Sequence, residues 1–214
     1  MMLVGDHDLP VLHATHSLLL PGGRLPFMPR SQEQLDALIA AVDSDVSPVA
    51  ALLAVRDGDA LHDVGTMVRV VRFGRQRCCG RWIAELDAID RIRVTAYRQL
   101  EPFTIARCSP LVDRAEDAAV LHALAVAIAD LAMLMNERFP ECVHVQRVMG
   151  RLREARLPEQ RGGAVAGLLL QAPIADLQEV LETEPLSARL EAVLGHLHAF
   201  LAQVGGPVSR RMVD

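Results

Sequence analysis

The spacing of apolar residues along the chain changes near residue 110. From Leu9 to about Pro110 the apolar runs are short and are separated by turn residues, which is typical of a β-barrel or a β-sandwich. Beyond Pro110 the apolar residues recur at helical intervals. We therefore expect a β-rich part over residues 1–112, a helical part over residues 113–207 and a tail over residues 208–214.

Eight segments of the first part have the composition of strands. Alternation with a period of two is clearest in Gly65–Phe73 and in Arg91–Tyr97. The predicted strands are Leu9–His13, Ser17–Leu20, Leu25–Met28, Pro48–Val55, Leu61–Phe73, Arg81–Ala88, Asp90–Tyr97 and Phe103–Pro110.

One helix interrupts these strands. Ser31 is its predicted N-cap, and Gln34 takes the reciprocal position of a capping box. The apolar stripe of this helix consists of Leu35, Leu38, Ile39 and Val42.

In the second part, Asp113 is predicted to cap a long helix that reaches about Phe139 and ends at Pro140. A second helix is expected over Glu141–Ala155, and an amphipathic last helix is expected to begin beside Pro185. Turn residues should delimit shorter helices between them and stop the last one. These residues are Pro158, Gly162, Gly163, Pro173, Gly205, Gly206 and Pro207.

Composition narrows the possible classes of protein. The 214 residues suffice for one large domain or two small ones, and an apolar content of 51% argues against disorder. Aromatic residues make up only 3%, so Leu, Val, Ala and Ile must build the core. The net charge of −5 gives nucleic acid no electrostatic reason to bind.

All 22 basic residues are arginines, and this absence of lysine excludes several chemistries. A P-loop lysine, a Schiff-base lysine and a Ser–Lys dyad are all impossible. The motifs GxxxxGK[ST], GxGxxG, GxSxG and HExxH are also missing. We therefore predict no catalytic residue, no metal ligand and no cofactor.

Three weaker candidates for chemistry remain. The pairs His13/His16 and His196/His198 are better explained as structural or solvated histidines, because their spacing does not bring the rings together. The adjacent Cys78 and Cys79 lie in a predicted hairpin tip, where a reactive thiol would still need a base. The arginines of residues 69–81 form either a solvated hairpin or a contact for an acidic partner.

The chain is expected to reside in the cytoplasm. The opening residues MMLVGDHDLP lack the features of a signal peptide, and the four cysteines do not indicate a disulfide framework. The longest apolar run, Ala118–Met135, is interrupted by His122 and Asp130, so a buried helix is favoured over a membrane span.

The order of motifs resembles that of the Lon protease N-terminal domain family. The opening LPVLHATHSLLLPGGRLPFM resembles the family's first strands, and DVGTMVRVVRF resembles its Val-Gly-Thr strand. LDAIDRIRV and FTIARCSPL follow in order, and ADLQEVLETEPLSARLEAVLGHL is similar to the family's helical signature. The similarity covers about residues 9–201. The matching positions are Gly65, Thr66, Asp87, Ala88, Arg91, Arg93, Leu177, Gln178, Leu181, Glu182, Arg189, Leu190 and Glu191.

Three departures suggest a divergent, stand-alone relative. Leu20 replaces a usual Phe, Ala88 replaces a usual Gly, and Asp176-Leu177 lacks the usual Lys. The resemblance implies an α+β fold, with a small PUA-like β-barrel containing one inserted helix and then a C-terminal helical bundle. In the full protease, ATPase and Ser–Lys peptidase modules follow this domain, but this chain has no lysine for either site. The resemblance thus implies a non-catalytic module that binds unfolded or degron-bearing polypeptide, in association with a protease or chaperone.

The segment LLLPGGRLPFMPR is our candidate binding surface. If residues 18–30 form a barrel edge, the prolines block edge-to-edge aggregation, and the apolar side chains divide between the core and an exposed rim. An equally simple interpretation places all of them in the core. The candidate rim residues are Leu18, Leu20, Leu25, Phe27 and Met28.

Two other functions compete with polypeptide binding. One is an enzyme that uses Cys78 and Cys79 or the histidines. The other is RNA binding by a PUA-like barrel, which the acidic net charge and the single Trp and Tyr oppose. A cleft that gathers titratable groups would favour an enzyme, whereas an apolar groove would favour a binding module.

Overall fold

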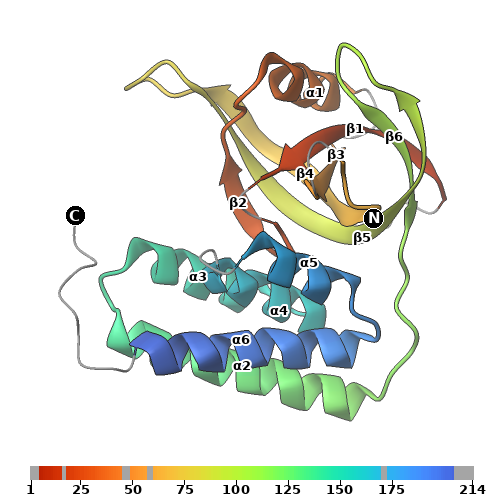
Figure 1. Cartoon of the computed structure of the whole chain (residues 1–214). Helices are drawn as coiled ribbons and strands as arrows, with labels where there is room; N and C mark the ends of the chain where they lie inside the picture. The colour runs from red at the N-terminus through yellow and green to blue at the C-terminus, as the bar shows by residue number, and fades with distance from the viewer. Residues whose placement is uncertain (1–4, 16–17, 45–48, 57–59, 170–172, 205–214) are drawn as a thin grey trace.

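The computed structural model describes residues 5–15, 18–44, 49–56, 60–169 and 173–204. His16, Ser17, Pro48 and the predicted tail at 208–214 lie outside these residues. A β-barrel lies above a layer of helices in Figure 1, which confirms the predicted α+β class. The strands are β1 (His7–Ala14), β2 (Arg24–Phe27), β3 (Val49–Ala54), β4 (Val64–Arg75), β5 (Trp82–Gln99) and β6 (Ile105–Pro110). The helices are α1 (Gln32–Val42), α2 (Ala118–Arg138), α3 (Val143–Glu154), α4 (Pro158–Ala166), the 3₁₀ turn η1 (Gly167–Leu169), α5 (Ile174–Glu182) and α6 (Leu186–Val204).

Five of the strands close into a ring. β1 pairs with β3 in parallel, and the antiparallel pairs β3–β4, β4–β5, β5–β6 and β6–β1 complete the circuit. β2 is the extra strand, because it pairs only with β5. The 18-residue β5 serves β2, β4 and β6 together, and the sequence pattern had divided it into two strands.

Strand β3 shows why its sequence VAALLA is apolar throughout. Ala50, Leu52 and Ala54 join a large cluster that continues into α1 and the C-terminal helices. Val49, Ala51 and Leu53 point the other way and join a smaller cluster with residues of β1, β4, β5 and β6. Both faces of this central strand are therefore buried, as they are in strands that lack a solvent face.

The predicted cap of α1 is present, with one change. The Ser31 hydroxyl accepts a hydrogen bond from the backbone N–H of Gln34 at 3.2 Å. The Gln34 side chain does not return to Ser31. Its Oε1 accepts the backbone N–H of Arg30 at 2.7 Å, and its Nε2 donates to the His13 carbonyl at 3.0 Å. Gln34 therefore both closes the helix start and attaches α1 to β1.

The expected strand at Ser17–Leu20 is not a strand in its described part, residues 18–20. Leu18, Leu19 and Leu20 are buried, and the Leu19 carbonyl accepts a hydrogen bond from the Thr66 hydroxyl. The chain then turns at Pro21 and presses its backbone against α4. These leucines thus belong to the joint between the barrel and the helices.

Asp113 does not cap α2, contrary to the sequence-based prediction. The helix begins five residues later, and its cap is Asp117, whose carboxylate accepts the Ala119 N–H at 2.8 Å. Asp113 lies in the connection that follows β6 and binds Arg91 of β5 and Arg189 of α6. Gly162 and Gly163, expected to delimit helices, lie inside α4.

Candidate functional site

A small pocket opens between the end of β1, the strand β2 and the start of α1. Its volume is about 120 Å³. Leu25, Phe27 and Met28 supply apolar lining, while His13, Arg30 and Gln34 supply polar groups. The pocket therefore contains three of the five candidate rim residues, together with polar groups that the sequence did not connect with them.

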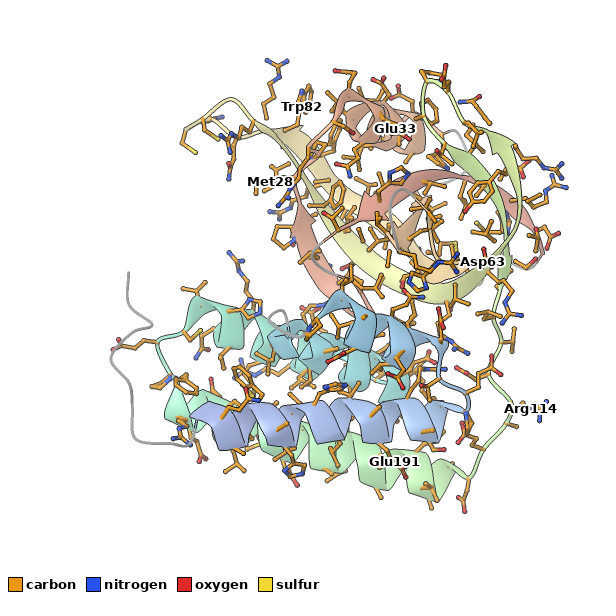
Figure 2. The ribbon with its side chains drawn as sticks, in the orientation of Figure 1. Met28, Glu33, Asp63, Trp82, Arg114 and Glu191 are labelled. Carbon is orange, nitrogen blue, oxygen red and sulfur yellow. The ribbon has the colours of Figure 1, made fainter. Side chains whose placement is uncertain are left out.

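The structure separates those five residues into two groups. Leu18, Leu20 and Leu25 are buried core residues, so they are not exposed rim positions. Phe27 is half-buried against the large core cluster, and 52% of the Met28 surface is exposed. Only Phe27 and Met28 remain available to a partner, and Figure 2 shows Met28 at the edge of the barrel beside α1.

The polar side of the pocket has an unused hydrogen-bonding atom. His13 Nε2 is buried and has no hydrogen-bond partner among the described residues, although Glu33 Oε1 lies 3.8 Å away. Arg30 is exposed at the mouth. The pocket can thus accept an apolar side chain and also offer polar contacts to the backbone that carries it.

The hairpin joining β4 and β5 extends past the pocket. The two strands remain paired as far as Arg75 and Trp82, whereas β2 stops opposite Ala84. Figure 1 shows this hairpin projecting from the barrel beyond α1. Phe73 and Trp82 stack with ring centroids 4.8 Å apart, and the Arg75 guanidinium lies 4.9 Å from the Trp82 ring centroid.

A second cleft, of about 400 Å³ and mainly polar, lies between the barrel and α3–α4. Arg151 crosses it, with Nη2 3.4 Å from the Asp87 carboxylate and 3.3 Å from the Gly22 carbonyl oxygen. Glu159 lines the same cleft, and burial, reinforced by nearby carboxylates, raises its pKa. These groups join β5 to the helices, and we interpret the cleft as part of that joint.

The centre of the joint is a buried cluster of charges. Arg91, only 2% exposed, donates to the carbonyls of Leu181 and Thr183 and to Asp113. Arg189 donates to both oxygens of Asp113. Burial alone would raise the pKa of Asp113, but the hydrogen bonds and charges of the two arginines outweigh it and lower that pKa.

The sequence identified Arg91, Gln178 and Arg189 only through the family resemblance. Gln178 is 2% exposed and donates to the Val64 carbonyl at 2.9 Å, again linking a helix to the barrel. Nothing in the local pattern indicated burial, because an arginine or glutamine usually marks a solvated position. These residues, which match the family's motifs, therefore lie at the joint between the two layers.

Among the described residues, no histidine or carboxylate is hydrogen-bonded to the candidate thiols Cys78 and Cys79. Cys78 and Cys79 are exposed, and Cys79 Sγ contacts Gln76 Oε1 at 3.1 Å. Burial raises the pKa of the Cys108 thiol to about 12, which makes it a poor nucleophile. Within the described ranges, no group of three His, Cys, Asp or Glu side chains could hold a metal ion.

Helix α2 is long and apolar enough to cross a membrane, with a mean hydropathy of 2.1 in its most apolar window. One such helix is weak evidence for a span, because a core helix of a soluble protein has the same length and composition. Here α2 packs against α6, α4 and α3. Only 28% of that window is buried, so α2 is a largely exposed helix of the bundle and not the buried helix that the sequence predicted.

Residues 8–199 match the sequence model of the ATP-dependent protease La (LON) substrate-binding domain. The chain belongs to this family. The similarity is to the Lon substrate-binding domain and not to the catalytic part of the protease. The family resemblance noted in the sequence is thereby confirmed.

Individual relatives agree with this assignment. The chain is 29% identical over 195 residues to a Lon protease of Anaeromyxobacter dehalogenans, which covers 87% of this chain and 22% of the relative. It is 30% identical over 141 residues to a Lon protease of Citrifermentans bemidjiense, covering 64% of this chain and 17% of the relative. The chain thus spans about a fifth of the length of these Lon proteases.

Solved structures of Lon N-terminal domains share the fold. The N-terminal domain of the Mycobacterium avium complex Lon protease aligns with a TM-score of 0.70 at 18% identity, covering 90% of this chain and 98% of that one. The Lon N-terminal domain protein of Xanthomonas campestris aligns with a TM-score of 0.57 at 21% identity, covering 88% and 98%. The small barrel followed by helices is therefore the architecture of Lon N-terminal domains.

Proposed function

We propose that this chain binds unfolded or degron-bearing polypeptide in the pocket between β1, β2 and α1. The observation that carries the proposal is Met28, an apolar side chain 52% exposed at the mouth of a pocket with mixed lining. Membership in a substrate-binding domain family supports a polypeptide as the ligand. An apolar residue of the client would contact Phe27 and Met28, and its backbone would meet His13 and Arg30.

The bound client would pass to a protease or chaperone. The Lon proteases that this chain resembles are several times longer, and we propose that an ATP-dependent protease receives the client. We also propose a cytoplasmic location. Its support is that Cys78, Cys79, Cys108 and Cys142 are all free, as expected in a reducing compartment.

Exchanging Met28 for serine tests the pocket directly. Met28 is exposed, so M28S should leave thermal stability nearly unchanged while reducing affinity for an unfolded client such as reduced, carboxymethylated α-lactalbumin. Removing one partly buried apolar contact should weaken binding about fivefold. Phe27→Ser is less informative, because Phe27 also packs on the core and its loss would destabilise the fold.

Leu157 provides the matched control. It is an apolar residue with 50% of its surface exposed, and it precedes α4 in the helical layer. L157S should bind the client as the parent protein does. Equal affinity of M28S and the parent protein, measured by fluorescence anisotropy, would remove the pocket from the binding site.

A further inference from the structure

The hairpin beyond the barrel carries a concentration of positive charge, defined here as the arginine arm, residues 72–82. Arg72, Arg75, Arg77 and Arg81 are all exposed on it. Arg72 has a carboxylate nearby, Glu85 Oε2 at 3.7 Å from its Nε. No ion pair is formed by Arg75, Arg77 or Arg81 within the described part of the chain. In a chain of net charge −5, three adjacent cations without acidic neighbours are a local exception.

The arm is ordered by its aromatic residues. Trp82, the only tryptophan, is stacked on Phe73 at an interplanar angle of 12°, and Arg75 lies over the same indole. Such stacking restricts the guanidinium to one region and reduces the entropy lost when it binds an anion. Arg75 is therefore presented to solvent in a defined place.

The arm is continuous with the proposed client pocket. Phe27 of β2 and Phe73 of β4 both pair with Ala84 of β5, so the three side chains lie in a row on one face of the sheet. Trp82 precedes Ala84 by two residues, about 7 Å along the strand. Figure 2 shows Met28 and Trp82 on the same side of the barrel, where the arm leaves it.

We propose that the arginine arm selects clients that carry Asp or Glu within about five residues of the apolar anchor held by the pocket. This inference rests on the proposed function and names its substrate class. An extended polypeptide anchored at Phe27 and Met28 runs along the arm if it continues in the direction of β2 and β4, antiparallel to β5. Its carboxylates then meet Arg75, Arg77 and Arg81.

An acidic polypeptide fits the arm better than a single-stranded nucleic acid. Nucleobases bind by stacking on open aromatic faces, but Trp82 already contacts Phe73 and Arg75. The only tyrosine, Tyr97, lies near the other end of β5. The remainder of the chain is more acidic than its net charge indicates and would repel a phosphate backbone beyond the arm.

Three labelled peptides test the selection by fluorescence anisotropy. The first has a Leu-Phe-Met anchor followed directly by Asp and Glu residues, the second has Asn and Gln in their place, and the third separates anchor and acids by a long Gly-Ser linker. We expect the first to bind about tenfold more tightly than the second, the effect of three exposed ion pairs. The third should behave as the second, and raising the salt from about 50 mM to about 500 mM should abolish the difference.

Charge reversal on the arm gives the complementary measurement. R75E/R77E/R81E should lose the preference for the acidic peptide while still binding the neutral one. R77E/R81E leaves the stack on Trp82 intact and should lose most of the preference for the acidic peptide. This double variant tests the proposal even if the triple variant fails to fold. R147E/R153E/R156E reverses three exposed arginines in or next to α3 and should keep the preference.

The outcomes separate this inference from the proposed function. Equal affinity for the acidic and neutral peptides overturns the role of the arm and leaves the pocket in place. If neither the acidic nor the neutral peptide binds, the role of the arm and the proposed function are both overturned. Tighter binding of oligouridine than of the acidic peptide at physiological salt, lost in R77E/R81E, would assign the arm to nucleic acid instead.

Discussion

Gly163 of α4 lies directly against the carbonyl oxygen of Pro21. A β-carbon added at Gly163 would lie 1.8 Å from that oxygen, and one added at Gly22 would lie 2.5 Å from the α-carbon of Gln160. Two Gly-Gly pairs, far apart in the sequence, thus allow the backbone of the β1–β2 connection to touch the backbone of α4. This contact fixes how closely the barrel approaches the helices.

Gly163→Ala should therefore destabilise the protein. The nearest atoms, the carbonyl oxygen and carbon of Pro21 and the carbonyl oxygen of Leu20, all belong to the backbone. The new methyl group can therefore be accommodated only by separating the two segments, at a cost of about 3 kcal/mol. Gly195→Ala is the control, because Gly195 lies in α6 with open space around it and should gain up to about 1 kcal/mol. Urea unfolding of both variants measures the difference. A neutral Gly163→Ala would show that the two backbones are farther apart than described.

Asp113 and Asp117 should differ sharply in their effects. Asp113→Asn leaves Arg189 buried without its counter-charge and leaves Arg91 with only Glu184, whose Oε1 lies 3.5 Å away, so it should cost about 3 kcal/mol. Asp117→Ala removes only a helix cap and should cost about 1 kcal/mol. Thermal or urea unfolding distinguishes the two. A larger loss of stability in Asp117→Ala than in Asp113→Asn would contradict these two assignments.

Asp113 should also affect how the stability of the protein changes at acidic pH. The pKa of Asp113 is lowered from an ordinary value of 3.8, so its contribution is complete above about pH 4 and is lost as the pH falls through the lowered value. Between about pH 4 and pH 2, Asp113→Asn should therefore lose less stability than the parent protein. Parallel acid titrations by circular dichroism measure this, and superimposable profiles would contradict it.

We propose a boundary between residues 112 and 113, and expect residues 1–112 alone to be much less stable than the whole chain. Without the helices, Arg91 loses the carbonyls of Leu181 and Thr183 as well as Asp113, and the buried leucines 18–20 become exposed. The shorter chain should melt earlier or aggregate. An unchanged melting temperature would show that the layers do not stabilise each other.

Thiol labelling should follow exposure. Iodoacetamide at neutral pH should modify Cys78, Cys79 and Cys142, while Cys108, buried and with a pKa of about 12, should react only in urea. The C78S/C79S variant should keep full client affinity. A loss of function in that variant would favour the thiol-based alternative.

Sequence patterns predicted correctly a feature that depends only on neighbouring residues. Ser31 could be identified as a cap because a helix start needs a side-chain acceptor within three residues. Asp113 had the same appearance, yet its role depends on Arg91 and Arg189, 22 and 76 positions away. A local sequence pattern cannot show contacts between residues so far apart in the chain. Likewise, Gly162 and Gly163 were expected to delimit helices, whereas they lie inside α4, where Gly162 faces Leu190 and Gly163 faces the backbone of Pro21.

The candidate site was predicted in part. An apolar segment rich in prolines drew attention to Phe27 and Met28, which line the pocket, but the spacing could not separate them from Leu18, Leu20 and Leu25 in the core. The sequence marked His13 only as one of a histidine pair and Gln34 only as part of a helix cap. It could not bring them together with Arg30, because the three reach the pocket from β1, α1 itself and the loop before α1. Only the closed barrel brings those elements together.

Strand β5 runs without interruption from Trp82 in the arm, past the partners of β2, to Arg91 at the joint with the helices. A client pulled while it is held at the arm would load this strand along its own axis. The hydrogen bonds to β4 lie across that axis and share the load in parallel, so they must fail together. The strand that presents the arm would thus resist a pulling force in shear, before the force disturbs the buried Arg91 near its middle.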